Sequence, residues 1–453
     1  MLKRICTFQK IYIKIYLIAK GVIMDINNGL LFESDFQQSL KEKFWYADAD
    51  PYYGERLFFE NSGGSLRLKK CVEKKAEIEA FPDCPERIHA RSVYLKGLVE
   101  KGTKEILEIV FGAKSGALIT ELTASQTMFQ MVGMIMENVG GTNAVVSSIE
   151  HPSAFDAIEY YCNKTGKEMR VVPANKKTGG IDVDEVIKRV DKNTTLLSIM
   201  AASNISGNVM DIKEIVKRAR EIKPDLYIIS DMVQHAPHCG IDVEDLALDG
   251  ANIAPYKFFG VRGCGFAYVS DRVAKFPHHK LLAKPQETFE LGTSAPANFA
   301  AMMEVINYVC EIGEHFIGKK SRKETYNEGM RRIHLQERAL LYRMLEGTPE
   351  VKGLRYIDGV TVHVDTKDLT QRDLIVAMSI DGADLTETVA EYQRRGVTVY
   401  ERVNTSIYSK RIVEAIGIKG AIRVSPLHCN GVEDIDKFLK ITAKLAKEYR
   451  SKL

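Results

Sequence analysis

Two stretches of sequence decide the fold: Leu226–Gln234, which reads LYIISDMVQ, and Ala251–Gly260, which reads ANIAPYKFFG. Each begins with a short apolar run and continues into polar groups, the carboxylate of Asp231 in the first and the amine of Lys257 in the second. Short apolar runs of this length predict buried β-strands. In an open parallel sheet, ligands bind in the crevice outside the carboxyl ends of the strands. We therefore expect Asp231 and Lys257 to belong to one ligand site.

The same pattern continues on both sides of these stretches. Short apolar runs predict further strands at Ala144–Ser148, Met169–Val172, Thr195–Ala201 and Gly265–Val269. Amphipathic helices are expected between them, each opened by an acidic residue that suits a helix N-terminus, as at Asp182–Val190 and Asp211–Ile222. Strands and helices that alternate at this spacing predict an α/β domain, whose mostly parallel sheet is covered by helices on both faces.

The second half of the chain predicts a smaller domain. A long apolar helix is expected over Asn298–Ile312, and the charged stretch Lys319–Glu337 that follows is typical of a helix that bridges two domains. The remainder mixes helices with short strands such as Thr361–Val364 and Ala421–Ser425, as an α+β domain would. We therefore expect an N-terminal segment at 24–75, a large domain at 76–310 and a small C-terminal domain at 311–453.

The first 23 residues, MLKRICTFQKIYIKIYLIAKGVI, contain five Lys or Arg residues and no acidic residue. Lys10, Lys14 and Lys20 interrupt the apolar residues, which argues against a membrane-spanning segment. One interpretation is an amphipathic helix for a membrane surface or for targeting. We favour a translated leader that is not part of the fold, because an acidic and conventional sequence begins at Met24.

Composition indicates an ordinary globular protein, with 45 % apolar and 27 % charged residues. The formal net charge of +3 offers no electrostatic reason to expect nucleic acid or an anionic membrane as a partner. The eight cysteines form no C-x-x-C pair, which is typical of reduced thiols in a cytoplasmic protein; they are Cys6, Cys71, Cys84, Cys162, Cys239, Cys264, Cys310 and Cys429.

Three motifs point to other chemistry and are rejected. Gly260–Gly265 is glycine-rich but precedes a strand, whereas a dinucleotide fingerprint opens a helix. Gly313–Lys320, GEHFIGKK, has Lys320 where a phosphate-binding loop needs a magnesium-binding Ser or Thr. His235–Cys239, HAPHC, has no second cluster that would complete a metal site, so we expect no metal.

Three residues of complementary chemistry remain near predicted strand ends: His151, Asp231 and Lys257. Together they match the needs of pyridoxal 5′-phosphate (PLP). A lysine amine forms a Schiff base with the cofactor aldehyde and moves protons at the substrate Cα. A carboxylate keeps the pyridine nitrogen protonated so that the ring accepts electrons, and a flat side chain covers the ring face. We therefore expect all three residues to be catalytic.

Around these residues the chain resembles the class V aminotransferases and the cysteine desulfurase/selenocysteine lyase group, from about Phe58 to Lys447. Glu150–Ser153 resembles the motif E-H-x-[SA], Asp231–Gln234 the motif D-x-x-Q, and Ser203–Gly207 the motif S-N-x-x-G. The resemblance implies the fold of PLP-dependent transferases of type I, in which a large cofactor-binding domain and a small domain form the chain. It also implies a homodimer with shared active sites.

The resemblance assigns a role to each matching residue. His151 would stack on the cofactor, Asp231 would bind its pyridine nitrogen and Gln234 its phenolic oxygen. Asn204 would lie beside the substrate, whose α-carboxylate Arg423 would clamp, since a guanidinium binds a carboxylate bidentately. The remaining expected cofactor contacts are Ser125 and Gln126 at the phosphate, Tyr256 beside Lys257, and Thr293, which would reach the cofactor of the partner subunit. Phe58–Gly64, in the N-terminal segment, would line the substrate side.

Two departures from the family pattern matter. Ala254-Pro-Tyr256-Lys257 replaces Ser-x-His-Lys, so a hydroxyl that contacts the phosphate is lost and Tyr256 takes the place of the His. Desulfurases also carry a nucleophilic cysteine in the loop before Arg423, but Val399–Ile407 contains none. Thr405 lies near that position, and a hydroxyl cannot form a persulfide. Cys429 lies beyond Arg423 and is interpreted as a core or surface thiol.

We therefore expect a PLP-dependent transferase of the class V aminotransferase type, which acts through Lys257 on the α-amino group of an amino acid, a small-molecule substrate. Two alternatives remain open. One is a cysteine desulfurase-like C–S or C–Se lyase that works without the loop cysteine. The other is a protein that binds PLP and has no catalytic activity.

Overall fold

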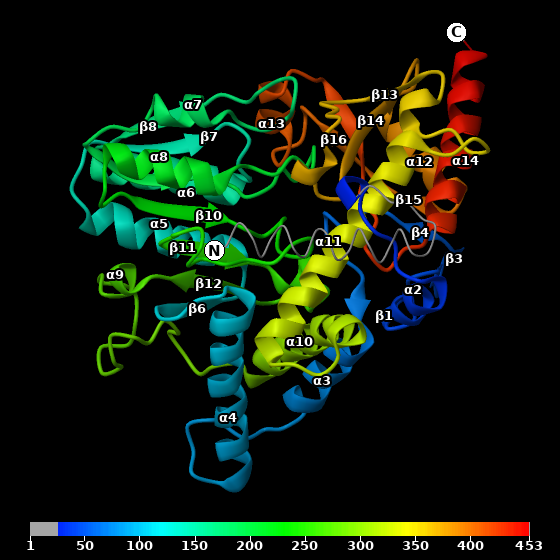
Figure 1. Cartoon of the computed structure of the whole chain (residues 1–453). Coiled ribbons are helices and arrows are strands. Elements are labelled where there is room, and N and C mark those ends of the chain that lie inside the picture. Colours follow the sequence, from blue (N-terminus) through cyan, green and yellow to red (C-terminus); the bar gives the residue numbers. More distant parts are fainter. Residues whose placement is uncertain (1–25, 453) are drawn as a thin grey trace.

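A seven-stranded sheet forms the centre of the larger part of the molecule in this computed structural model, which describes residues 26–452 (Figure 1). In spatial order the strands are β6 (Ala117–Glu121), β12 (Gly265–Val269), β11 (Gly250–Ile253), β10 (Tyr227–Asp231), β9 (Thr194–Ser198), β7 (Asn143–Ser147) and β8 (Glu168–Val172). Neighbours from β11 to β8 pair in parallel, whereas β12 pairs antiparallel with β11 and β6. The predicted mostly parallel α/β sheet is thus confirmed.

Some element boundaries differ from the expected ones. β9 ends at Ser198 instead of Ala201, and the helix expected over Asp182–Val190 is confined to α7 (Val183–Ile187). The sequence did not predict β6, which lies at the edge of the sheet and is only partly buried. An edge strand of this kind lacks the continuous apolar run that marks a buried parallel strand. The predicted leader, residues 1–23, lies outside the described residues.

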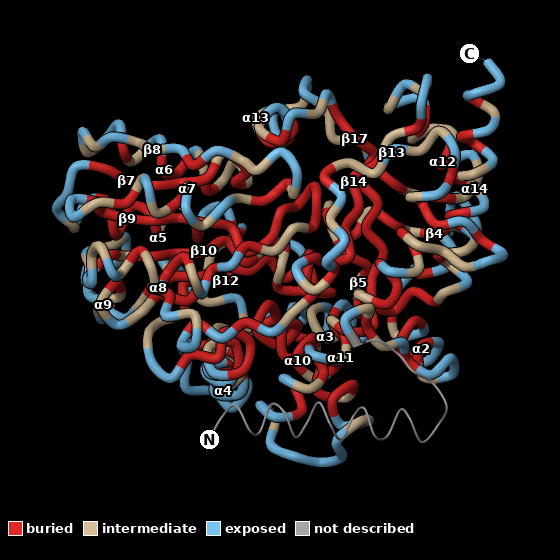
Figure 2. Tube along the Cα trace, turned by 45° about the horizontal axis from the view of Figure 1, so that its top comes forward, coloured by how far each residue is buried: buried red, intermediate tan, exposed pale blue. Residues whose placement is uncertain are grey.

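Helices cover both faces of the central sheet. α5 (Ala124–Asn138) and α6 (Pro152–Thr165) pack on one face, and α8 (Ile212–Ile222) packs on the other. Successive strand residues point to opposite faces, so Val146 joins the core beneath α5 while Val145 joins the core beneath α8. Figure 2 shows the strands buried among helices whose outer faces are exposed. Water is therefore excluded from both faces of the sheet.

A second, antiparallel sheet forms the core of the C-terminal part. Its order is β13 (Val360–Val362), β14 (Val376–Ile380), β17 (Gly420–Val424) and β16 (Tyr400–Val403). This core includes side chains from three helices: α11 (Arg322–Glu346), α12 (Leu385–Arg394) and α14 (Val432–Arg450). α10 (Pro296–Ile317) and α11 correspond to the expected apolar and charged helices. The domain boundaries at 75/76 and 310/311 stay predictions.

The N-terminal segment packs against both parts of the molecule. β4 (Leu57–Phe58) pairs in parallel with β15 (Val397–Thr398) of the C-terminal part. β1 (Phe44–Trp45) pairs with β5 (Arg67–Leu68), and the N–H of Leu68 donates a hydrogen bond to the carbonyl oxygen of Phe259, in the larger part, at 3.0 Å. The remaining elements are η1 (Ile26–Asn28), α2 (Ser34–Lys41), β2 (Ala49–Asp50), β3 (Gly54–Glu55), α3 (Lys69–Glu79), α4 (Ala90–Glu105), η2 (Ile106–Val110), η3 (Pro255–Lys257), α9 (Asp271–Ala274), η4 (Leu354–Tyr356), η5 (Leu369–Gln371) and α13 (Lys410–Ala415). Within residues 26–452, no helix combines the length and apolar character needed to cross a bilayer.

Two glycines allow α10 and α11 to pack closely. A methyl group on Gly313 would lie 1.8 Å from the carbonyl oxygen of Thr325, and one on Gly329 would lie 2.0 Å from that of Val309. Both contacts are with backbone atoms, so no side-chain rotation can relieve them. The close approach of these helices therefore requires glycine at both positions.

We expect Gly329→Ala to lower the free energy of unfolding by about 1–3 kcal/mol, because overpacking forces the two backbones apart. Gly97→Ala is the matched control, since a methyl group on this glycine of α4 meets nothing within 4 Å. That control should stabilise the protein by about 0.5–1 kcal/mol, the usual gain of alanine over glycine in a helix. Urea unfolding of both variants measures the difference, and equal effects would contradict the close packing.

Candidate functional site

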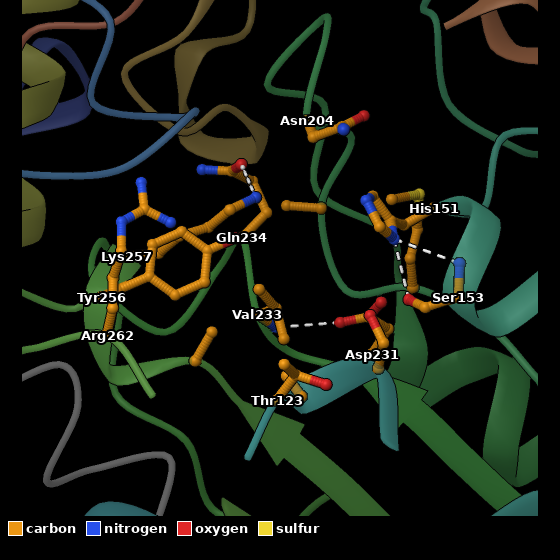
Figure 3. A pocket seen from close by; sticks show the side chains of 15 residues that line it. Thr123, His151, Ser153, Asn204, Asp231, Val233, Gln234, Tyr256, Lys257 and Arg262 are labelled. Atoms are coloured by element: carbon orange, nitrogen blue, oxygen red, sulfur yellow. Dashed lines mark hydrogen bonds between the residues drawn. The ribbon is translucent and has the colours of Figure 1, made fainter. Parts of the chain in front are cut away.

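A pocket lies at the carboxyl ends of the central strands (Figure 3). Seven of the ten predicted site residues line it: Ser125, His151, Asn204, Asp231, Gln234, Tyr256 and Lys257. The other lining residues are Thr123, Ala124, Ser153, Met200, Ala202, Val233, Ala254 and Arg262. The fold thus brings together most of the residues that the sequence predicted for the site, and their roles stay predictions.

The amine of Lys257 is the buried reactive group of this pocket. Lys257 ends the short helix η3 that follows β11, and its Nζ donates a hydrogen bond to Oε1 of Gln234 at 3.4 Å. The pKa of this amine is lowered to about 7, first by burial and then by the positive charge of Arg423, while Asp231 opposes the shift. A substantial fraction of Lys257 is therefore neutral, and so nucleophilic, near pH 7.

Asp231 supplies a carboxylate in the same pocket. It is the last residue of β10, whereas the sequence predicted that it would directly follow the strand. Its Oδ1 accepts a hydrogen bond from the Val233 N–H at 3.0 Å. Burial raises the pKa of this carboxyl group, and the charge of Lys257 lowers it. A protonated nitrogen on a ligand would stabilise the ionised form of Asp231.

His151 begins α6, where its Nδ1 accepts a hydrogen bond from the Ser153 N–H at 3.2 Å and lies 2.7 Å from Oγ of Ser153. Burial lowers the pKa of this imidazole to about 3, so the ring is neutral at physiological pH. The preceding residue, Glu150, is fully buried, and burial raises its pKa to about 8. A neutral, flat ring at this position suits contact with the face of an aromatic ligand.

An arginine of the C-terminal part holds the turn that carries His151. Arg411, in α13, donates hydrogen bonds to the carbonyl oxygens of Ser148 at 2.7 Å and Glu150 at 2.9 Å. Its guanidinium also lies over the ring of Phe155, with its carbon 3.7 Å from the ring centre. The position of His151 therefore depends on both parts of the molecule, and no local sequence pattern marks this contact.

The N-terminus of α5 suits an anion. Thr123 caps this helix, and its Oγ1 accepts a hydrogen bond from the Gln126 N–H at 3.2 Å. The first N–H groups of a helix have no partner within the helix, and such groups bind phosphate. Ala124 and Ser125 present this first turn to the pocket. Sequence reasoning missed Thr123, although a threonine directly before a helix is a recognisable cap.

Three predicted site residues lie outside the pocket lining. Oε1 of Gln126 accepts a hydrogen bond from Oγ1 of Thr123 at 3.0 Å. Thr293 lies near Cys84 and Pro296, in a separate surface hollow. Arg423 is fully buried directly behind the pocket, where its Nη1 donates to the carbonyl oxygen of Asn204 at 2.9 Å. The roles expected for these three residues stay predictions.

The two histidines of the HAPHC motif have carboxylate partners. Nδ1 of His235 lies 3.0 Å from Oδ2 of Asp373, and Nδ1 of His238 lies 2.6 Å from Oε2 of Glu337. Across residues 26–452, no three His, Cys, Asp or Glu side chains are grouped as metal ligands would be. These histidines instead connect the turn after β10 to the C-terminal part of the chain.

The sequence profile of the aminotransferase class-V family matches residues 84–438. The chain belongs to this family. It is 29 % identical to the cysteine desulfurase IscS of Dictyoglomus turgidum over 187 residues, which are 41 % of this chain and 46 % of that protein. It is 28 % identical to the selenocysteine lyase of Homo sapiens over 208 residues, 42 % of this chain and 46 % of that protein. This chain thus spans about half the length of these relatives.

Solved structures show the same fold. The cysteine desulfurase from Thermococcus onnurineus superposes with a TM-score of 0.73 at 20 % identity, over 87 % of this chain and 95 % of that one. A cysteine desulfurase from Escherichia coli has the same TM-score at 15 % identity, over 92 % and 99 % of the two chains. The predicted fold of PLP-dependent enzymes of type I is therefore confirmed.

Enzymes of this family depend on PLP, and the pocket fits that cofactor. The buried lysine amine, the carboxylate and the helix N-terminus match the cofactor's aldehyde, ring nitrogen and phosphate. Oδ1 of Asn204 is also buried without a hydrogen-bond partner, so the pocket contains an acceptor that a ligand can satisfy.

We expect Lys257→Ala to abolish the visible absorption band of the bound cofactor, because no other amine lines the pocket among the described residues. The exposed Lys410→Ala is the control and should keep the band. Absorbance spectra of both purified variants measure this, and thermal unfolding shows whether each is folded. A folded Lys257→Ala protein with the wild-type band would contradict the assignment.

The rate of PLP uptake by cofactor-free protein should rise as the pH increases through about 7, because only the neutral Lys257 amine attacks an aldehyde. Arg402 is another cation that lowers this pKa. Arg402→Gln should therefore move the midpoint to higher pH. Stopped-flow absorbance over a pH series measures both midpoints. A midpoint near that of an ordinary lysine, or one that moves to lower pH in the variant, would refute this prediction.

Proposed function

We propose that this chain is a PLP-dependent lyase that cleaves the Cβ–S or Cβ–Se bond of an amino acid and releases sulfide or selenide directly. The relatives called cysteine desulfurase and selenocysteine lyase support this leaving group. They favour the lyase alternative over the aminotransferase function that we expected from the sequence. Direct release is supported by one observation, the lack of a thiol at the described pocket.

The cysteines of the described residues lie away from the pocket or are chemically inert. None of them lines it, and all seven are free thiols. Burial raises the pKa of Cys71 and of Cys264 to about 12, and it also raises that of Cys429. The loop between β16 and α13, residues 404–409, contains no cysteine. A sulfur atom that leaves the substrate therefore has no thiolate acceptor beside the pocket.

The proposed roles of the side chains follow from their positions. When bound, PLP supplies an electron sink for bonds at the substrate Cα. Lys257 has a pKa near 7, so its amine is suited to take the proton from Cα and later to return one. Arg423 and Asn204 would hold the α-carboxylate, and Asp231 would face the ring nitrogen. His151 would cover the ring without adding charge, because its imidazole is neutral.

Direct elimination needs no co-reactant other than water. Cysteine and water give pyruvate, ammonia and hydrogen sulfide, so atoms and charges balance without an oxidant. The sulfur leaves with the electron pair of the Cβ–S bond and takes up a proton. Sulfur transfer to a loop cysteine would instead give alanine and a persulfide, which requires a thiol that the described pocket does not contain.

We expect the PLP-loaded enzyme to convert cysteine or selenocysteine into sulfide or selenide and pyruvate in equal amounts. Iodoacetamide should change the rate by less than about twofold, because the described cysteines lie outside the pocket. Sulfide, pyruvate and alanine are measured in the same reaction. Alanine together with loss of activity on alkylation would show a thiol-dependent desulfurase. Conversion of the cofactor to its pyridoxamine form would show an aminotransferase.

The structure describes a single chain, so the homodimer with shared active sites that the sequence predicts belongs to this proposal. Thr293 lies outside the pocket of its own chain, which is compatible with a contact to the cofactor of a partner subunit. The proposal also includes an amino acid as the small-molecule substrate, which the family resemblance supports, and a cytoplasmic location, which the unpaired cysteines of the described residues support.

A further inference from the structure

Two arginines at the substrate side share a single carboxylate. Arg423 lies on β17 and Arg402 on β16, and the register pairs Arg423 with Tyr400. Because residues two apart in a strand point to the same face, both arginine side chains lie on one face of the sheet. Glu60 accepts a hydrogen bond from Nη2 of Arg423 through Oε1, and the same oxygen lies 3.8 Å from Nη2 of Arg402.

This cluster carries one excess positive charge in a place with little water. The side chain of Arg423 is 0 % exposed, that of Arg402 is 14 % exposed and that of Glu60 is 16 % exposed. Nε of each arginine and Oε2 of Glu60 are buried without hydrogen-bond partners. Buried charged groups are costly unless they are paired and hydrogen-bonded. The cluster therefore lacks one carboxylate.

An amino-acid substrate brings one carboxylate, and of the two arginines in this cluster Arg423 is the one that contacts a residue of the pocket lining. Its Nη1 donates to the carbonyl oxygen of Asn204, which lines the pocket. Nη2 of the same guanidinium is occupied by Glu60. A bidentate contact between Arg423 and a substrate carboxylate therefore requires the carboxylate of Glu60 to leave.

We propose that Glu60 is an internal carboxylate that occupies Arg423 in the free enzyme and moves onto Arg402 when the substrate carboxylate binds. This inference rests on the proposed function only in taking an amino acid as the substrate, with its α-carboxylate at Arg423. After the exchange, two guanidinium groups face two carboxylates, and the excess charge is gone. Glu60 is thus a positioning residue that acts through the two arginines.

The exchange needs only a rotation of the Glu60 side chain. The backbone on either side is fixed, because Ser425 N–H donates to the Phe59 carbonyl at 2.7 Å and Asn61 N–H donates to the Ser425 carbonyl at 3.1 Å. Gly63 allows the carboxylate to reach Arg423, since a methyl group at this glycine would lie 2.3 Å from Oε1 of Glu60. The carboxylate therefore has a fixed backbone anchor and a near second partner.

The charge balance also limits how many substrate carboxylates the cluster accepts. One resident carboxylate and one substrate carboxylate neutralise Arg402 and Arg423. A second carboxylate on the substrate side chain would find no free guanidinium group in this cluster. The cluster therefore accepts one substrate carboxylate, and removal of the Glu60 charge should let it accept a second.

A double-mutant cycle with propionate, a carboxylate without an amine, tests the exchange in the PLP-loaded enzyme. Glu60→Gln should lower the inhibition constant of propionate about tenfold or more, because the internal competitor is lost. Arg402→Gln should raise it about tenfold, since Glu60 then has no second partner and stays on Arg423. In the Glu60→Gln background, Arg402→Gln should change it by less than about twofold, which is the non-additivity expected of coupled residues.

Two readouts check that binding itself changes. Calorimetric titration of propionate into the same loaded proteins should follow the inhibition constants. Succinate, which carries two carboxylates, should gain more than propionate in the Glu60→Gln variant. Lys410→Gln, which removes an exposed charge at the start of α13, is the control and should leave all constants unchanged. If Glu60→Gln does not fold, Glu60→Asp replaces it; its shorter side chain holds Arg423 less closely and should give a smaller decrease.

The outcomes separate this inference from the proposed reaction. An equal effect of Arg402→Gln in both backgrounds would mean that Arg402 binds the ligand itself, which overturns the exchange. An inhibition constant that Glu60→Gln leaves unchanged overturns it as well. The expected cycle together with products other than sulfide or selenide would refute the lyase function and leave the exchange in place. Arg423→Gln that leaves propionate binding intact would refute the placement of the substrate carboxylate on Arg423, and with it the exchange.

Discussion

The chemistry of this site depends on keeping the Lys257 amine away from water and close to guanidinium groups. Burial lowers its pKa to about 7, and Arg423 and Arg402 act in the same direction. Asp231 and Glu60 raise the same pKa, so their negative charges partly offset the effect of the two arginines. Lys257 and Asp231 come from the central sheet, whereas both arginines come from the antiparallel sheet. The reactivity of the Lys257 amine thus requires the two sheets to keep a fixed position relative to each other.

Much of the fold and of the cofactor side of the site could be predicted from sequence, because that information is local. The run LYIIS before Asp231 predicts a buried strand, and strand order in an α/β sheet places its end beside other strand ends. Lys257 and His151 could be found in the same way. The edge strand β6 was missed because its partial burial leaves a short and weakly apolar pattern.

The substrate side could not be predicted to the same extent, because its contacts join distant parts of the chain. Arg423 was expected to clamp a carboxylate, but its pairing with Glu60 joins residues 363 positions apart. No local sequence pattern marks Arg402 or Arg411 as part of the site. Only the packing of the two sheets shows that one shares a carboxylate with Arg423 and that the other holds the turn of His151.

The pairing of β4 with β15 has a consequence for how the chain is completed during synthesis. Figure 1 shows β4 beside β15, yet Arg423 leaves the ribosome 363 residues after Glu60. Contacts between such distant segments form slowly, and domains synthesised first generally fold first. The central sheet with Lys257 can therefore assemble on the nascent chain before its carboxylate-binding side exists. The cofactor side and the carboxylate-binding side of one active site are thus completed at different times in every newly made molecule.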